Sequence, residues 1–129
     1  MPHLSPRAHA LLIALLIAPL APTLSLAAEL RCGWFANPSP GNASLYDKDG
    51  EWIVAAQGGH QSNGDWPPAF RRGQWVNHGP GSYGYGCACL KVEVDRVAMT
   101  VLDILATTPR PLSACRRDKA LTGIERKLR

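Results

Sequence analysis

The chain has 129 residues, a formal net charge of +4 and only nine aromatic residues other than histidine. This length is enough for one domain, and no internal repeat or second domain is evident. Few aromatic residues lie among the basic ones, which argues against a nucleic-acid surface, so we expect no nucleic-acid partner.

The N-terminal segment has the pattern of a secretory signal peptide. The first ten residues, MPHLSPRAHA, contain Arg7 and no acid, and the apolar stretch LLIALLIAPLAPTLSLAA follows. A basic start, an apolar core and a small-residue cleavage site are the features of such a peptide. The sequence SLA at residues 25–27 places cleavage after Ala27 or Ala28, so we assign residues 1–28 to the signal peptide.

A membrane anchor is the alternative interpretation of the same segment. Its apolar run from Ala8 to Leu20 is broken by Pro19 and falls short of the roughly 20 residues that a membrane-spanning helix needs. We therefore expect an exported, periplasmic or extracellular protein with no membrane span after cleavage. It would consist of one domain at residues 29–123 and a basic C-terminal tail at residues 124–129.

The mature sequence reads as short strands separated by loops rich in glycine and proline. Asp49-Gly50 and Asp95-Arg96 each separate two strand-like runs, which predicts two hairpins. The helix is expected to begin after Pro111 and to end before Gly123. The expected strands are residues 31–35, 43–46, 51–56, 74–76, 83–94 and 97–106, and the expected helix is residues 112–121. The predicted fold is β-rich α+β, a small antiparallel sheet of two hairpins with a short C-terminal helix.

Two different faces are expected on the strand at residues 83–94. Tyr83, Tyr85, Cys87 and Cys89 share one face, which we expect to be buried. The opposite face begins with Gly84, Gly86 and Ala88, whose lack of bulk suggests close approach of another group. That group is a ligand or, in our preferred interpretation, an aromatic ring. The candidate rings are those of Trp34, Trp52, Trp66 and Trp75.

Four cysteines in an exported chain predict two disulfides, which would staple the domain. On a strand, Cys87 and Cys89 lie on one side about 6.6 Å apart, whereas bridged Cβ atoms lie about 3.8 Å apart. One of the two therefore pairs with Cys32 and the other with Cys115. Both such pairings stay open, and we favour Cys32–Cys87 with Cys89–Cys115.

A metal site and a redox pair are the alternatives for these cysteines. Structural zinc sites use paired CxxC-type spacings, but this chain has one close pair only. A reactive CxC pair would be expected at a helix N-terminus rather than on a strand. His60 and His78 stand alone in glycine-rich loops. We therefore expect no bound metal and no cofactor.

The loop from Gly58 to Gly73 is the candidate ligand-binding segment. It contains GGHQSNGDWPP, and loops of this length in compact domains are usually functional or disordered. We assign a ligand-binding role to His60, Asp65 and Trp66, and the alternative for Trp66 is that its ring packs the loop onto the core. No G-x-S-x-G motif is present, and we assign no catalytic residue. A small hydrolase using His60 and Asp65 is the enzymatic alternative.

Several segments together resemble a bacterial family known as domain of unknown function 4087. They are CGWFANPSPGN from Cys32, DGEWIVAAQGG from Asp49, QWV from Gln74, YGYGCAC from Tyr83 and PLSAC from Pro111. The resemblance implies a small exported bacterial domain with shared cysteines and implies no activity. We expect a non-enzymatic binding or structural module of the cell envelope, whose partner is an envelope polymer or protein.

Overall fold

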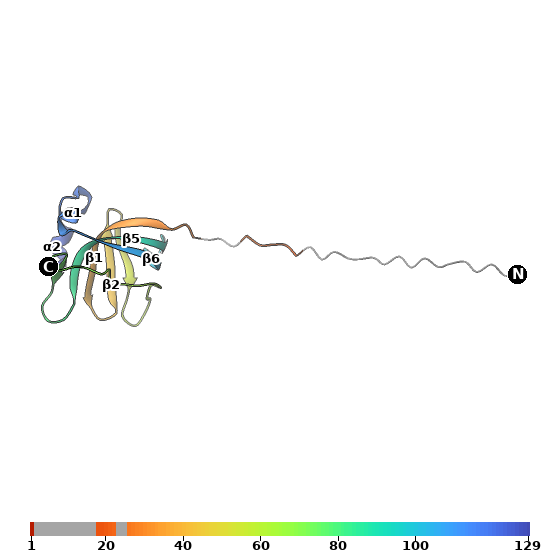
Figure 1. Cartoon of the computed structure of the whole chain (residues 1–129), viewed down its shortest axis with the longest axis horizontal. Coiled ribbons are helices and arrows are strands. Elements are labelled where there is room, and N and C mark those ends of the chain that lie inside the picture. The colour runs from red at the N-terminus through yellow and green to blue at the C-terminus, as the bar shows by residue number, and fades with distance from the viewer. Residues whose placement is uncertain (2–17, 23–25) are drawn as a thin grey trace.

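The computed structural model describes Met1, residues 18–22 and residues 26–129 (Figure 1). Most of the expected signal peptide lies outside the described residues, which leaves that prediction open. Within the described part of the chain, no helix is long and apolar enough to cross a membrane. The chain enters the domain at one end, and the C-terminal helices lie at the other end (Figure 1).

The domain is built from six strands, and both expected hairpins are present. Their bounds are β1 Glu29–Ser39, β2 Asn42–Asp47, β3 Gly50–Ala55, β4 Trp75–Asn77, β5 Gly84–Asp95 and β6 Thr100–Arg110. The β-rich fold class is therefore confirmed. The first expected strand, at residues 31–35, is too short, because β1 continues to Ser39 through an irregular pairing with β2 between Ala36 and Ser39.

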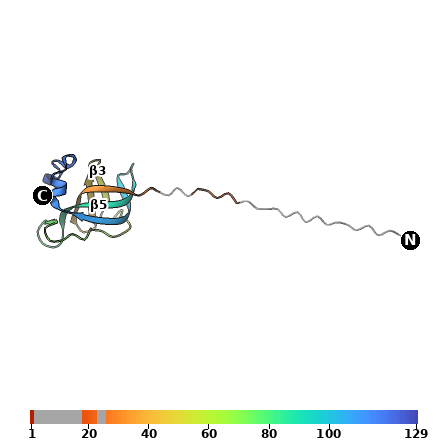
Figure 2. The ribbon, with the colours of Figure 1, turned by 45° about the horizontal axis from the view of Figure 1, so that its top comes forward.

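The strands close into a barrel. The pairings run β1–β2–β3–β6–β5, and β5 pairs again with β1 (Figure 2). All are antiparallel except β3–β6, which is a single parallel pair between Ile53 and Thr100. This is a partly open, five-stranded Greek-key barrel, the architecture of OB-folds. The short β4 pairs with the start of β5, on the side that β6 occupies from Cys87 onward.

The barrel interior forms the main core. It contains the buried side chains Phe35, Leu45, Trp52, Val54, Leu90, Val92 and Val101. Three half-buried rings from the loop and β4 pack against it, those of Trp66, Phe70 and Trp75. A Cβ atom at Gly86 would lie 2.6 Å from the Phe70 ring, which confirms that a ring approaches the glycine face of β5. Phe70 is not one of the four expected tryptophans, but a Cβ atom at Gly84 on the same face would lie 3.0 Å from Nε1 of Trp75, which is one of them.

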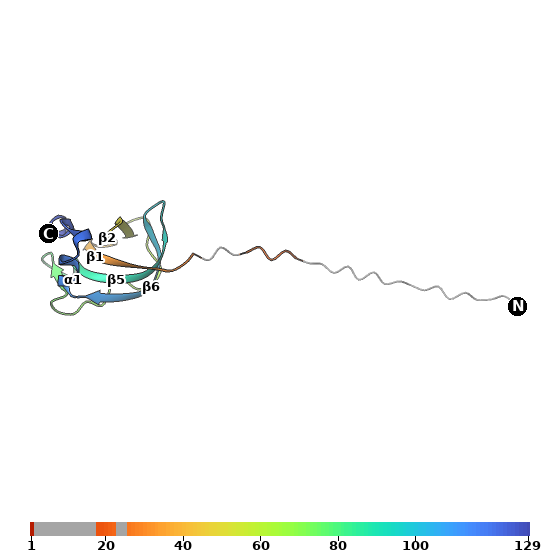
Figure 3. The same ribbon diagram turned by 90° about the horizontal axis from the view of Figure 1, so that it is seen from above.

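The C-terminal segment lies at one end of the barrel (Figure 3), and a second core lies between it and the strands. That segment consists of α1 Leu112–Arg116, the 3-10 helix η1 Lys119–Leu121 and α2 Ile124–Leu128. The expected single helix at 112–121 is therefore interrupted, because the Asp118 side chain caps η1 by accepting from the Ala120 amide. Buried Trp34, Tyr85 and Cys87 from the barrel meet Cys115 and Leu121 in this core. Tyr85, Cys87 and Cys89 are buried as predicted, whereas Tyr83, just before β5, is half-buried.

The C-terminal tail is joined to this second core. Ile124 and Leu128 are half-buried and pack against it, and the Tyr85 hydroxyl donates to Glu125 at 3.1 Å. From the sequence alone, with only two apolar side chains after Gly123, we would expect these residues to be dispensable for folding. Because Ile124 and Leu128 both pack against the second core, we now expect these residues to contribute to stability.

Ending the chain at Gly123 is expected to lower the free energy of unfolding by about 2 kcal/mol, because two partly buried aliphatic side chains are lost. Urea unfolding of the truncated and full chains measures this difference. Removal of Arg129 alone serves as the control and should leave stability unchanged. A chain ending at Gly123 that unfolds at the same urea concentration as the full chain would contradict the docking of α2.

Candidate functional site

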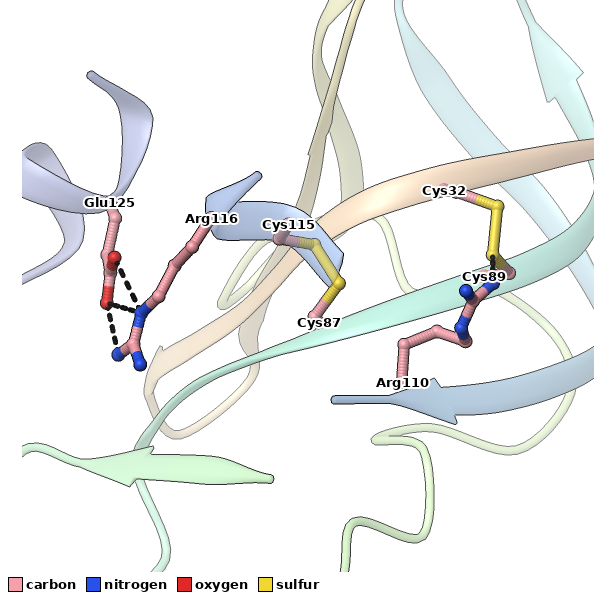
Figure 4. The surroundings of a disulfide bond; sticks show 7 residues. All are labelled: Cys32, Cys87, Cys89, Arg110, Cys115, Arg116 and Glu125. Atoms are coloured by element: carbon pink, nitrogen blue, oxygen red, sulfur yellow. Dashed lines mark hydrogen bonds and ion pairs between the residues drawn. A yellow bond between two sulfur atoms is a disulfide. The ribbon is translucent and has the colours of Figure 1, made fainter. Parts of the chain in front are cut away.

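The two disulfides are Cys32–Cys89 and Cys87–Cys115 (Figure 4). Two bridges among these four residues are as predicted, but the favoured pairing is wrong. The register of β1 on β5 places Cys32 directly opposite Cys89, with Cα atoms 4.0 Å apart, and places Trp34 opposite Cys87. Cys87 is thus left to meet Cys115 on α1, with Cα atoms 5.7 Å apart.

The two bridges have different structural roles. Cys32–Cys89 joins two strands that also pair with each other, whereas Cys87–Cys115 fastens α1 to the barrel. All four sulfur atoms are used in these bonds. Among the described residues, no group of three histidine, cysteine or acidic side chains is placed to hold a metal ion.

A depression made of adjoining hollows lies beside both disulfides. It consists of three adjoining hollows of about 380, 130 and 190 Å³. The first two share Cys32 and Asp118, and the last two share Cys115 and Leu121. We call this depression the disulfide furrow. It is lined from end to end by Glu29–Cys32, Asp47–Asp49, Arg96, Arg110, the two disulfides, Asp118, Arg116 and Glu125.

A larger hollow of about 510 Å³ adjoins the furrow at Glu29 and Arg96. One of its walls is Leu26–Ala28. These residues belong to the expected signal peptide, and its removal would take that wall away. We therefore leave this hollow out of the candidate site.

The start of β1 lines the furrow, and one of its two edges is not paired with another strand there. β5 pairs with β1 from Glu29 onward, but β2 pairs with β1 only from Trp34 onward. On the β2 side, residues 29–33 have no strand partner among the described residues. Leu30 on this stretch is 69% exposed. An exposed strand edge presents backbone donors and acceptors that can pair with another chain.

Buried Arg31 holds together the walls of the 380 Å³ hollow of the furrow. Its guanidinium lies 3.7 Å from the centroid of the Trp52 ring and donates to Asp47 at 2.7 Å and Asp49 at 3.0 Å. Burial opposes the charge of Arg31, but these hydrogen bonds and one to Glu29 outweigh it, so its pKa is raised. Arg31 therefore stays charged and ties β1 to the β2–β3 turn.

A second fixed ion pair closes the opposite end of the furrow. Arg116 donates to both oxygens of Glu125, at distances from 2.7 to 3.1 Å. The hydrogen bond to Arg116 is the main reason why the pKa of Glu125 is lowered, despite partial burial. Glu125 therefore remains ionised and holds α2 against α1.

Exposed charges lie on the rim between these two buried or half-buried ion pairs. The side chains of Lys48 and Arg96 are 71% and 67% exposed, although they also contact Asp49 and Glu29. Asp118 supplies an exposed carboxylate on the same rim. The furrow thus combines a strand edge with charges of both signs, which suits a polar, extended ligand.

The residues expected to form a ligand site lie elsewhere. His60 is half-buried, and its Nε2 lies 2.7 Å from the Val101 carbonyl oxygen. Asp65 is exposed and lines a separate hollow of about 200 Å³ with Gly64 and residues 104–107. None of the five hollows described here is lined by both His60 and Asp65.

Trp66 packs against the barrel interior. We expect Trp66→Ala to lower the free energy of unfolding by about 2–4 kcal/mol, as buried large-to-small changes do, while Trp66→Phe keeps most of the stability. Thermal or urea unfolding of the two variants measures the difference. If the Trp66→Ala protein were as stable as the parent, the Trp66 ring would not be needed for the core, and the ligand-binding role predicted from the sequence would be favoured.

The furrow residues were not assigned to a site from the sequence. The sequence does indicate that Arg31 is buried, because side-chain alternation along β1 places it on the same face as Phe35, which is buried in the barrel. A charged residue on an inward face needs buried partners. The positions of Arg96 and Asp118 at the furrow depend on long-range folding, and no local pattern indicates them.

Comparison with known proteins identifies the family of the chain but no characterised relative. A family model described as "Protein of unknown function (DUF4087)" matches residues 26–122, which confirms the resemblance noted in the sequence. No curated protein and no solved structure matches the chain.

Proposed function

Because the chain belongs to the DUF4087 family, whose description assigns no activity, we propose its function from the disulfide furrow. The protein is an exported, non-enzymatic binding module of the bacterial cell envelope. Its ligand is an extended polypeptide segment of an envelope protein, held in the furrow.

Export is supported by two independent features. The first 28 residues carry the basic, apolar and small-residue regions of a signal peptide. Two disulfides use every cysteine of the chain, and such bonds persist in oxidising compartments. Both features agree with a periplasmic or extracellular location.

The unpaired edge of β1 at residues 29–33 is the observation that carries the proposal. An extended peptide can add a strand to such an edge, with backbone hydrogen bonds giving affinity and side-chain contacts giving specificity. Exposed Leu30 offers an apolar contact, and Lys48, Arg96 and Asp118 offer charged ones. A peptide backbone matches this edge better than a polymer without amide groups does.

The hydrolase alternative has less support. It would use His60 as a base and Asp65 as its partner in one cleft. The His60 ring nitrogen instead contacts a backbone carbonyl of β6, and Asp65 faces another hollow. The positions of His60 and Asp65 therefore favour a binding function over a hydrolase that uses these two residues.

Capture from an envelope extract tests the proposal. The mature domain is immobilised beside a furrow variant, Lys48→Glu with Arg96→Glu, and a control variant, Arg71→Glu with Arg72→Glu. Both double variants change the net charge equally, and all four positions are exposed. We expect the parent and the control to retain the same envelope protein and the furrow variant to lose it.

Two outcomes would overturn the proposed function. Equal retention by all three proteins would show that the furrow does not hold the ligand. Retention of a glycan polymer in place of a protein would contradict the polypeptide ligand. Unfolding curves for each variant must match the parent, so that loss of capture reports on the surface alone.

A further inference from the structure

We propose that Cys32–Cys89 is a thiol-exchange site in which an incoming thiolate bonds to Cys32 and Cys89 is the leaving group, while Cys87–Cys115 stays closed. This inference concerns covalent chemistry and goes beyond the binding role proposed above. It rests on the unequal exposure of the four cysteines and on one arginine beside Cys89.

Exposure directs the attack to one sulfur. Cys32 is exposed, whereas Cys89 is 6% exposed. Cys87 and Cys115 are 3% and 4% exposed, so the second bridge is buried at both ends. The rate of exchange depends on access to the attacked sulfur. A thiolate in the furrow therefore meets Cys32 first.

The surroundings of Cys89 favour its departure. Arg110 on β6 places Nη1 3.7 Å from the Cys89 sulfur (Figure 4). A nearby guanidinium stabilises a thiolate and lowers the pKa of the thiol, and a leaving thiol with a lower pKa departs faster. The charged side chains that line this hollow are Arg110 and Asp118, and only Arg110 makes a contact to sulfur.

The exchange balances without an added oxidant. The incoming thiolate forms a bond to the Cys32 sulfur, the Cys32–Cys89 bond breaks, and its electron pair goes to Cys89. In the reverse step, the Cys89 thiolate attacks the Cys32 sulfur of the mixed disulfide, the bond to the incoming sulfur breaks, and the incoming group leaves as a thiolate. β1 and β5 pair from Glu29 to Asn37 in any case, so the two cysteines stay opposite each other and can bond again.

Peptide mapping after brief exposure to reduced glutathione tests the direction of attack. The natively folded, oxidised protein is incubated with glutathione, quenched with acid, alkylated and mapped without reduction. We expect glutathione on Cys32, an alkyl group on Cys89 and an intact Cys87–Cys115 bridge. Glutathione on Cys89, simultaneous opening of both bridges, or a protein that does not react would each overturn the proposal.

Arginine variants test the leaving-group effect. We expect Arg110→Gln to slow the appearance of the mixed disulfide by about three- to tenfold and Arg110→Lys to retain part of the rate. The matched control, Arg72→Gln, removes an exposed charge outside the furrow and should react at the parent rate. A parent rate in Arg110→Gln, or an equal slowing in Arg72→Gln, would show that the contact to Cys89 has no such role.

Discussion

Replacement of Cys87 and Cys115 by serine is expected to lower the free energy of unfolding by about 3.6 kcal/mol in the chain-entropy treatment of a closed loop. The loop in question has a sequence separation of 28. The matched variant, Cys32→Ser with Cys89→Ser, opens a loop with a separation of 57 and should cost about 4 kcal/mol. Urea unfolding without reductant measures both values.

The two variants should differ in where they loosen the domain. Cys87–Cys115 cross-links α1 to β5 of the barrel, so its loss should increase amide hydrogen exchange in α1, η1 and α2. Loss of Cys32–Cys89 leaves the Cys87–Cys115 bridge to α1 intact, so we expect faster amide hydrogen exchange at the start of β1 and unchanged exchange in the helices. The same exchange pattern in both variants would contradict this division of roles.

Asp47→Ala is expected to lower the free energy of unfolding by about 3–5 kcal/mol, because it removes one partner of a buried ion pair. The Asp47 side chain is 4% exposed and accepts from Arg31 at 2.7 Å. It also accepts from the Trp52 indole at 3.0 Å and from the Asp49 amide at 2.8 Å. The change therefore leaves the buried Trp52 indole N–H without its acceptor and removes the nearest carboxylate partner of buried Arg31.

Asp49→Ala is the matched control for Asp47→Ala. Asp49 also contacts Arg31, but its side chain is 43% exposed, and such ion pairs contribute at most about 1 kcal/mol. Chemical unfolding of both variants gives the comparison. Equal losses for the two, or a stable Asp47→Ala protein, would show that the buried network does not anchor β1.

Local patterns predicted the hairpins and the number of disulfides. Asp49-Gly50 lies at the β2–β3 turn, and alternating side chains identified the two faces of β5. The pairing of the cysteines depends on the register between Cys32 and Cys89, which lie 57 residues apart in sequence. Alternation within one strand carries no information on that register, so two pairings stayed open and the favoured one was wrong.

Barrel closure and the furrow also depend on long-range contacts. The parallel pairing of β3 with β6 and the return of β5 to β1 join segments far apart in the chain. The loop at residues 58–73 is predicted to bind a ligand because it is long and holds His60, Asp65 and Trp66. In the structure, its length allows Ser62, His60 and Trp66 to reach the barrel, where they contact β3, β6 and the core.

Site-specific photocrosslinking in intact cells tests the furrow as a binding site most directly. A photoreactive residue is placed at Lys48 or Asp118 on the furrow, or at Gln57 or Arg72 as exposed controls outside it. We predict that both furrow positions crosslink one envelope protein and that neither control position does. Crosslinks to that protein from Gln57 or Arg72, with none from Lys48 and Asp118, would contradict the account.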